Sequence, residues 1–307
     1  MIYKKPEFWD RKNSIISILL LPISLIVIFV SKIKKYVSKK KFKIPVICVG
    51  NIYIGGTGKT PISAEIFDIL KSYGKNPAFV KKFYPYIKDE ILLLEKKGKV
   101  FCDKNRLISI DKLQNNNFNV AILDDGYQDF SIHKDLSILC FNRDIWIGNG
   151  RVIPSGPLRE SISNINRANC VMINGDKNKE IEKQILKYNP NVDIIYFKYQ
   201  LLSKDVIKNN KIVAFAGIGT PRNFFELLKK NNFEIYDTLS FPDHYQYKEK
   251  DISKLKNLAL KNNCILLTTE KDYLRINDKF RKDVQFVELK IKIDNKERFV
   301  NLINNFI

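Results

Sequence analysis

The stretch that decides the fold runs from Gly50 to Pro61 and spells GNIYIGGTGKTP. A nearly continuous apolar run, residues 44–49, precedes it, and residues 61–73 repeat apolar side chains at helical spacing. A strand, a glycine-rich turn ending in Gly-Lys-Thr and a helix, in this order, are the context of a phosphate-binding loop. We therefore predict that this stretch binds a nucleoside triphosphate as its magnesium complex.

Each residue type of the loop has a physical role in holding phosphate. Glycines let consecutive backbone N–H groups point at phosphate oxygens, the lysine brings positive charge to the β- and γ-phosphates, and the threonine hydroxyl is placed for Mg²⁺. The predicted binding residues are Gly55, Gly56, Thr57, Gly58, Lys59 and Thr60. The usual pattern has glycine five residues before Gly58, where this chain has Tyr53, so the loop is a variant. A chance Gly-Lys-Thr at a strand–helix turn is the alternative.

A second apolar segment, residues 120–123, ends in two carboxylates, Asp124 and Asp125. Carboxylates at the end of a strand hold Mg²⁺ opposite a phosphate loop in many nucleotide-binding proteins. An acidic pair that only caps a turn is the alternative. The two elements together are less expected by chance than either alone, so both support a magnesium–nucleotide site.

Further apolar runs follow the loop at intervals, with helical or irregular segments between them. Fully apolar strands are typical of parallel sheets covered on both faces. The runs are residues 78–80, 120–123, 136–141, 170–173 and 194–197. This alternation predicts an α/β fold of the P-loop NTPase type with a mostly parallel sheet.

A second α/β pattern starts after a polar, lysine-rich stretch at residues 201–210. We expect a membrane-associated N-terminal segment at residues 1–41, a P-loop nucleotide-binding domain at 42–205 and a smaller C-terminal α/β domain at 206–307. The expected elements of the last domain are strands 212–216 and 264–268 and helices 221–230 and 250–262. A final helix, residues 296–306, is compatible with either domain.

The charge balance of the 307-residue chain is strongly basic, with 53 Lys and Arg against 33 Asp and Glu and a net charge of +20. Such an excess suits an anionic partner, either an acidic membrane surface or a phosphorylated substrate; lysines scattered over a solvated surface are the alternative. No nucleic-acid-binding motif accompanies them, so we expect no nucleic-acid partner. The five cysteines show no CxxC spacing, and we predict reduced, buried strand thiols rather than a disulfide or zinc site.

Residues 15–30 form an apolar run interrupted only by Ser17, Pro22 and Ser24, with basic residues on both sides. As a helix it would span roughly 24 Å, short of the roughly 30 Å hydrocarbon core of a bilayer. A cleaved signal peptide needs small residues at its cleavage site, but the first alanine is Ala64. A buried core helix fits poorly because the run is apolar on all sides.

We therefore predict a short anchor that dips into or barely spans the bilayer, with Trp9 near the headgroups. The dense lysine cluster after the run favours a cytoplasmic position for the following domain.

Seven motifs in a fixed order give the chain a resemblance to a known family. Between Gly50 and Asp272 the chain contains GNIYIGGTGKTP, DEILLL, LDDGYQ, GNGRVIPSGPLRE, AGIGTPRNFF, FPDHYQY and TTEKD. The chain resembles the tetraacyldisaccharide 4'-kinase family of lipid A biosynthesis over most of its length. The resemblance implies a P-loop kinase at the cytoplasmic face of the bacterial inner membrane, with an active site in a cleft between two α/β domains.

The resemblance also implies the reaction. ATP with Mg²⁺ would donate its γ-phosphate to the 4'-hydroxyl of tetraacyldisaccharide 1-phosphate to give lipid IVA. Asp89 then matches the catalytic base and His244 its partner. Asp124, Asp125 and Gln128 match the metal- and phosphate-orienting residues, and the pair Arg159 and Glu160 faces the transferred phosphate and the metal.

The chain departs from the family pattern at two places. Residues 81–84, Lys-Lys-Phe-Tyr, stand where the family usually has an S-R-G-Y-like segment, and Asp129 stands where it often has His. Without the resemblance, Asp89 fits a solvated helix start, His244 a structural histidine, and Arg159 with Glu160 a surface pair. A membrane-associated P-loop ATPase or GTPase acting as a switch or transport factor is the rival function, although no guanine-binding NKxD-like motif is found. Acyl-chain preference and oligomeric state are not predicted.

Overall fold

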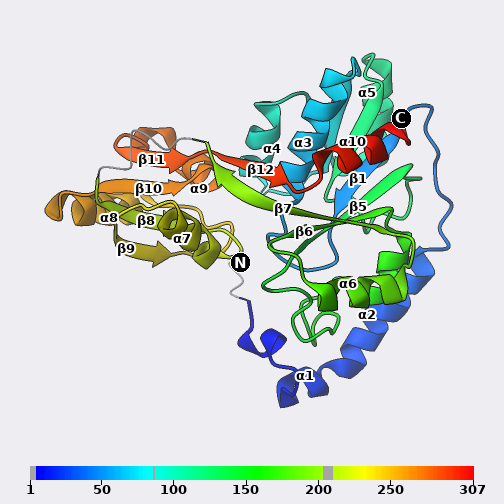
Figure 1. Ribbon diagram of the computed structural model, residues 1–307, viewed down its shortest axis with the longest axis horizontal. Helices are drawn as coiled ribbons and strands as arrows, with labels where there is room; N and C mark the ends of the chain where they lie inside the picture. Colours follow the sequence, from blue (N-terminus) through cyan, green and yellow to red (C-terminus); the bar gives the residue numbers. More distant parts are fainter. Residues whose placement is uncertain (1–4, 86, 203–209) are drawn as a thin grey trace. The chain divides into compact units, whose positions relative to one another are not determined.

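The computed structural model describes residues 5–85, 87–202 and 210–307, and these form two compact units (Figure 1). The larger unit comprises Lys5–Tyr84, Leu94–Lys198 and Ile291–Ile307. The smaller unit contains the described parts of Pro85–Leu93 and Tyr199–Lys290. The α/β class predicted from the sequence is confirmed. The predicted domain ranges, 42–205 and 206–307, stay a prediction.

An eight-stranded sheet forms the centre of the larger unit, in the order β12-β7-β6-β5-β1-β4-β2-β3. The strands from β7 to β3 in this order pair in parallel. Their bounds are Val46–Gly50 (β1), Pro77–Lys82 (β2), Val100–Asp103 (β3), Val120–Asp124 (β4), Leu136–Asn142 (β5), Cys170–Asn174 (β6), Asp193–Leu201 (β7) and Leu289–Ile293 (β12). The carboxyl ends of β1 and β4 therefore meet at the same edge, which is where ligands bind in open α/β sheets.

Helices cover this sheet on both faces. α3 (Lys59–Ser72) packs against β1, β2 and β4, and the rings of Phe67 and Phe79 stack between α3 and β2. A large apolar cluster joins the strands to α5 (Arg106–Asn115) and α6 (Lys179–Tyr188). α10 (Lys296–Asn304) belongs to this unit and reaches α3 through an ion pair of Lys296 with Glu65.

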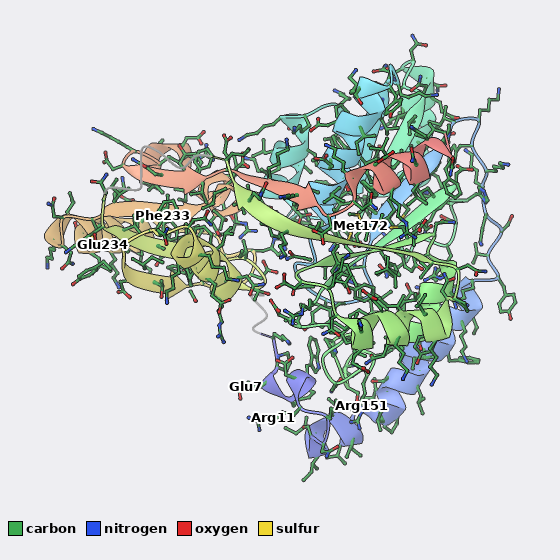
Figure 2. The ribbon with its side chains drawn as sticks, viewed as in Figure 1. Glu7, Arg11, Arg151, Met172, Phe233 and Glu234 are labelled. Carbon is green, nitrogen blue, oxygen red and sulfur yellow. The ribbon has the colours of Figure 1, made fainter. Side chains whose placement is uncertain are left out.

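The smaller unit has a four-stranded parallel sheet in the order β11-β10-β8-β9. Separate apolar clusters lie on α7 and α8, and Phe233 and Glu234 beyond α7 are labelled in Figure 2. The elements are α4 (Lys88–Glu95, which continues into the larger unit), β8 (Ile212–Ala216), α7 (Pro221–Lys230), β9 (Ile235–Ser240), α8 (Glu249–Lys261), β10 (Ile265–Thr269), α9 (Glu270–Arg275), η3 (Asp278–Phe280) and β11 (Val284–Val287).

The N-terminal apolar run forms two helices rather than one, α1 (Ile15–Leu19) and α2 (Leu21–Lys34), after a short turn η1 (Glu7–Asp10). In an ordinary surface helix the apolar side chains face the protein and the polar ones face solvent, but α1 and α2 show the reverse. The polar residues Ser17 and Ser24 are buried, at 0% and 2% exposure, while the apolar side chains face outward. The exposed ones include Ile15, Ile16, Leu19, Ile23, Leu25, Ile26, Phe29 and Ile33. The predicted alternative of a buried core helix is therefore wrong.

Hydrogen bonds explain why the serines face the protein. Ser17 Oγ donates to the carbonyl of Ser155 at 2.6 Å, and Ser24 Oγ donates to the carbonyl of Val152 at 2.8 Å. Arg151, labelled in Figure 2, donates to Ser17 Oγ at 2.8 Å. These hydrogen bonds attach α1 and α2 to the loop that precedes Arg159. Among the described residues, no helix combines the length and the apolar character needed to cross a bilayer.

Element positions agree with the sequence pattern within a few residues, with instructive exceptions. The strand expected at 44–49 begins at Val46, because Pro45 has no N–H for a ladder. The short strands β3, β9 and β11 were not expected. Cys48, Cys140 and Cys170 are buried as predicted, whereas Cys102 and Cys264 are only partly buried; all five are free thiols.

Candidate active site

The phosphate loop leaves β1 through residues whose backbone needs glycine. Gly55 has φ of 130° and Gly58 has φ of 91°, both in the region that favours glycine. The Asn51 amide donates to the Gly55 carbonyl at 3.2 Å and to Thr57 Oγ1 at 2.9 Å, which ties the two sides of the loop together. Lys59 and Thr60 then open α3, a helix of 14 residues, so its N-terminal N–H groups and dipole face the loop.

Tyr53, at the position of the missing glycine, points into the protein. Its side chain is buried in a small apolar cluster with Val152 and Leu158, and its backbone forms an antiparallel bridge to Leu158. The Ile54 N–H donates to the Pro157 carbonyl at 2.9 Å. At the position of the missing glycine, the loop therefore packs against the segment that contains Val152 and Leu158.

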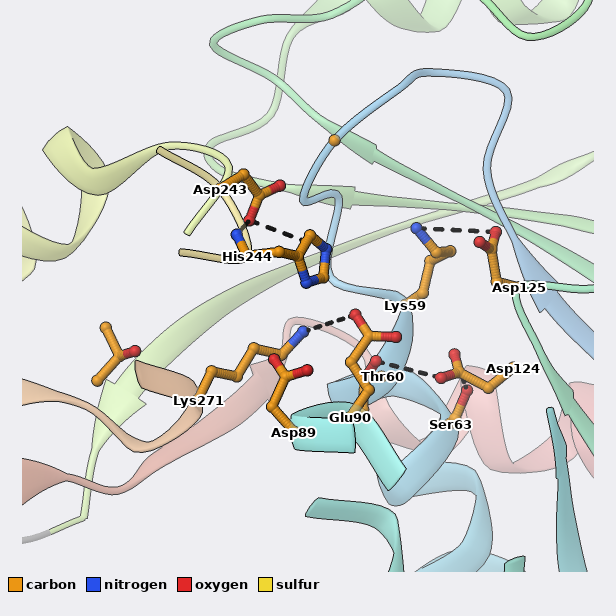
Figure 3. A network of polar contacts seen from close by, with 12 residues as sticks. Lys59, Thr60, Ser63, Asp89, Glu90, Asp124, Asp125, Asp243, His244 and Lys271 are labelled. Atoms are coloured by element: carbon orange, nitrogen blue, oxygen red, sulfur yellow. Dashed lines mark hydrogen bonds and ion pairs between the residues drawn. The ribbon is translucent and has the colours of Figure 1, made fainter. Parts of the chain in front are cut away.

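Asp124 ends β4 and is fully buried. Thr60 Oγ1 donates to its Oδ2 and Ser63 Oγ to its Oδ1, both at 3.2 Å (Figure 3). A third partner comes from β2, where Lys81 Nζ lies 2.5 Å from Oδ2. Thr60 and Asp124, both predicted metal ligands, are thus in direct contact.

Asp125 faces two cations of the predicted site. Arg159 Nη1 lies 2.8 Å from its Oδ1, and Lys59 Nζ lies 3.8 Å from the same atom (Figure 3). Burial raises the pKa of Asp125, but Lys59, Arg159 and Lys81 outweigh it and bring the pKa down to about 2. The residue also has a φ of 64°, and left-handed backbone in a non-glycine residue often marks functional sites.

The start of the phosphate loop is hydrogen-bonded to the predicted site residues Gln128 and Arg159, and Gln128 in turn binds Glu160. The Gln128 amide donates to the Asn51 carbonyl at 2.8 Å and to Glu160 Oε1 at 2.9 Å. Arg159 and Glu160 do not form a surface pair with each other. Glu160 is 1% exposed, and its Oε2 accepts hydrogen bonds from Arg167 at 2.5 Å and Asn164 at 2.7 Å. Glu160 reaches the phosphate loop through Gln128.

Oxygen donors suited to Mg²⁺ gather where Thr60, Asp124 and Asp125 meet. Mg²⁺ usually binds one or two carboxylates together with substrate phosphates and water rather than a closed protein cage. Within the described ranges, no group of three His, Cys, Asp or Glu side chains forms such a cage. This donor set therefore fits a metal that arrives with a nucleotide.

In the smaller unit, Asp89 lies at the start of α4 with a side chain that is 1% exposed. Arg275 holds it, with Nε 3.0 Å and Nη2 2.7 Å from the same oxygen, Oδ2. Burial lowers the pKa of Arg275, but Asp89 and Asp272 outweigh it, so the guanidinium keeps its charge. The alternative of a solvated helix start is wrong. The neighbouring Glu90 pairs with Lys271 at 3.1 Å (Figure 3).

His244 lies in the same unit as Asp89. Its N–H donates to the Gly217 carbonyl at 3.1 Å, and Arg275 Nη1 donates to the same carbonyl at 2.5 Å. Its backbone φ of 58° lies in the left-handed region, which few residues other than glycine adopt. Arg275 thus connects the Asp89 carboxylate to the turn that carries His244. The other histidine, His133, is partly exposed.

Comparisons with known proteins agree with the family resemblance of the sequence motifs. A family model described as tetraacyldisaccharide-1-P 4'-kinase (LpxK) matches residues 16–307. The chain belongs to the tetraacyldisaccharide 4'-kinase family. It is 44% identical to the tetraacyldisaccharide 4'-kinase of Pelagibacter ubique (strain HTCC1062), over 98% of this chain and 97% of that protein. It is 34% identical to the enzyme of that name from Rickettsia bellii (strain OSU 85-389), over 94% of each chain.

A solved structure supports the kinase-family fold. The crystal structure of LpxK from Aquifex aeolicus in complex with ATP aligns with a TM-score of 0.73 at 25% identity. The alignment covers 95% of this chain and all of that one. The similarity therefore extends over both units of the family member described here.

Three residues that bind motif carboxylates, two in the larger unit and one in the smaller unit, were not predicted from the sequence. Lys81, Arg167 and Arg275 each bind a carboxylate of the motifs, namely Asp124, Glu160 and Asp89. Lys81 and Arg275 lie 43 and 186 positions from their partners. A lysine inside the apolar strand β2 was the one available indication.

Titration of Asp125 provides a direct test of the charge arrangement. Because its folded-state pKa is about 2 and the ordinary value is 3.8, its ionised form stabilises the fold above about pH 4. That contribution is lost as the pH falls through about 2. We expect the difference in unfolding free energy between the wild type and Asp125→Asn, measured by urea unfolding, to shrink over this interval.

The matched control is Asp68→Asn on α3, which removes an exposed ion pair with Lys97. Its effect on the unfolding free energy should be within about 1 kcal/mol. A difference for Asp125→Asn that stays constant from pH 5 to pH 2 contradicts the assignment.

Proposed function

We propose that this chain transfers the γ-phosphate of ATP to the 4'-hydroxyl of tetraacyldisaccharide 1-phosphate, giving lipid IVA and ADP. The observation that carries the proposal is the contact of Thr60, Asp124 and Lys81 beside the phosphate loop, in a chain that belongs to this kinase family. A switch ATPase is the weaker alternative, because it has no need for the buried Asp89–Arg275 pair.

The donor half of the reaction belongs to the phosphate loop. We assign Gly55 to Gly58 to backbone contacts with the phosphates, Lys59 to the β- and γ-phosphates and Thr60 to the metal. Asp124 and Asp125 would hold Mg²⁺, which neutralises charge on the transferred phosphoryl group when bound. Gln128 and Arg159 lie beside Asp125 and would orient the γ-phosphate. Glu160 supports them through Gln128, so we propose a positioning role for it rather than direct metal contact.

The acceptor half requires a base. A sugar hydroxyl loses its proton as its oxygen bonds to phosphorus and the bond from phosphorus to the ADP oxygen breaks. We propose that Asp89 accepts this proton. Arg275 binds Oδ2 with two donors and so fixes the orientation of the carboxylate. His244 would stabilise the charge.

We also propose that α1 and α2 attach the protein to the cytoplasmic face of the bacterial inner membrane. Their apolar side chains are exposed and their serines are buried, which is the arrangement expected for a helix pair lying in the membrane interface. Lys32 and Lys34 in the last turn of α2, followed by Lys39 to Lys41, suit anionic lipid headgroups. Trp9 donates to the Pro154 carbonyl at 2.9 Å, so we place it at the edge of this surface.

A lipid phosphorylation assay tests the function. The purified protein is incubated in detergent with Mg²⁺, ATP labelled at the γ-phosphate and the tetraacyl disaccharide 1-phosphate. We expect label in the lipid and none without Mg²⁺. Free hydrolysis of ATP with no label in lipid would sink the kinase proposal and favour the ATPase alternative.

Replacing the proposed base separates chemistry from nucleotide binding. Asp89→Asn keeps the shape of the side chain but removes its capacity to accept a proton. We expect kcat to fall by about 10²–10⁴-fold, with little change in the affinity for ATP. Steady-state kinetics and fluorescent-nucleotide binding measure the two quantities, and Asp68→Asn is the control. An unchanged kcat removes Asp89 from this role.

Membrane attachment is tested with vesicles. We expect the double variant Leu25→Gln/Phe29→Gln to lose most of its binding to vesicles of phosphatidylethanolamine and phosphatidylglycerol in sedimentation. High salt should also weaken wild-type binding, because it screens the lysines. Leu260→Gln, on the exposed side of α8, is the matched control and should bind as the wild type does. Equal binding by all three proteins would contradict the proposal.

A further inference from the structure

Lys81 is a charged residue in the interior of the nucleotide-binding unit. It lies near the carboxyl end of β2, and its side chain is 4% exposed. Its Nζ is 2.5 Å from Asp124 Oδ2, and the Asp124 side chain is fully buried.

The position of Lys81 matters because of the atom it binds. Asp124 Oδ2 also accepts the hydrogen bond of Thr60 Oγ1, and Thr60 and Asp124 are the side chains proposed for Mg²⁺. An ammonium group at Oδ2 supplies the positive charge that a metal would otherwise bring to this carboxylate. Lys81 also contributes to holding the neighbouring Asp125 ionised.

A buried carboxylate without a positive partner is strongly destabilising, so the protein needs a cation at this place even without ligands. Lys59 does not serve Asp124 directly, since its nearest carboxylate is that of Asp125, at 3.8 Å. The ammonium group of Lys81 is the cation that pairs with Asp124. Its charge also repels a free divalent ion that approaches the same oxygen.

We propose that Lys81 is a built-in counter-cation for Asp124 that preserves the site without metal and excludes free Mg²⁺, so that the metal enters only together with the nucleotide. The inference rests on the proposed metal role of Asp124. The triphosphate brings the negative charge that offsets the repulsion between Lys81 and the metal. The flexible lysine stem allows Nζ to turn from the carboxylate toward a phosphate oxygen when the complex binds.

The test replaces Lys81 by methionine, which keeps the length of the side chain without its charge. We expect Lys81→Met to have a lower Tm than the wild type in the absence of metal. Millimolar MgCl₂ without nucleotide should raise the Tm of the variant by several degrees and leave that of the wild type unchanged. Mn²⁺ binding followed by electron paramagnetic resonance should be at least about tenfold tighter in the variant.

Three controls make the outcome specific. Lys82→Met removes the adjacent lysine of β2, which lies near the ring of Tyr84, and should not alter the metal response. The double variant Lys81→Met/Asp124→Asn should lose the response, because the metal then has no buried carboxylate to bind. Lys81→Gln serves in the same measurements if Lys81→Met does not fold.

The inference is overturned if free Mn²⁺ binds the wild type and the Lys81 variant equally, or if Mg²⁺ stabilises both to the same extent. These measurements contain no nucleotide or lipid, so they are independent of the kinase assay. A wild type that phosphorylates lipid but shows either result retains the proposed function and loses the inference. A wild type that binds neither Mg²⁺ with ATP nor ATP alone contradicts both.

Discussion

The carboxylate of Asp124 ends the central strand β4 inside the protein, where a bare charge is not tolerated. Its hydrogen bonds to Thr60 and Ser63 fix the first turn of α3 against β4, and its ion pair fixes the end of β2. Three elements that are far apart in the sequence are thereby held at the edge of the sheet where the phosphate loop opens. The geometry of the loop depends on this one buried charge and its partners.

The same principle recurs in the smaller unit. Asp89 is buried against Arg275, which also binds Asp272 and the Gly217 carbonyl. Tyr247 and Thr269 also donate to Asp272, so both oxygens of this carboxylate are hydrogen-bonded. Such networks hold their members in defined positions, because partial satisfaction is costly in an apolar surrounding. A carboxylate held in this way is oriented before any substrate arrives.

Local patterns were sufficient to predict most of the sheet, and they singled out the residues that the structure brings together where β1 and β4 end. Strands such as β4 and β5 are apolar over most of their length, and the Gly-Lys-Thr turn with Asp124 at the end of β4 was recognisable because each signal occupies a few consecutive residues. The roles of Lys81 and Arg275 were not predicted, because nothing in the local sequence indicates which distant carboxylate a lysine or arginine binds. Helices α1 and α2, whose serines are buried and whose apolar side chains are exposed, were predicted only in part. There the apolar run was recognised, but the break at Leu20 and the role of the two serines depend on contacts with residues 149–155.

Tyr53 has a consequence for how nucleotide-binding chains are recognised. The common letter pattern has glycine at the first position of the loop. In this chain the tyrosine at that position packs its ring into the cluster with Val152 and Leu158. A search that demands the first glycine would therefore miss this chain, whereas a search built on the positive φ angles at Gly55 and Gly58 would include it.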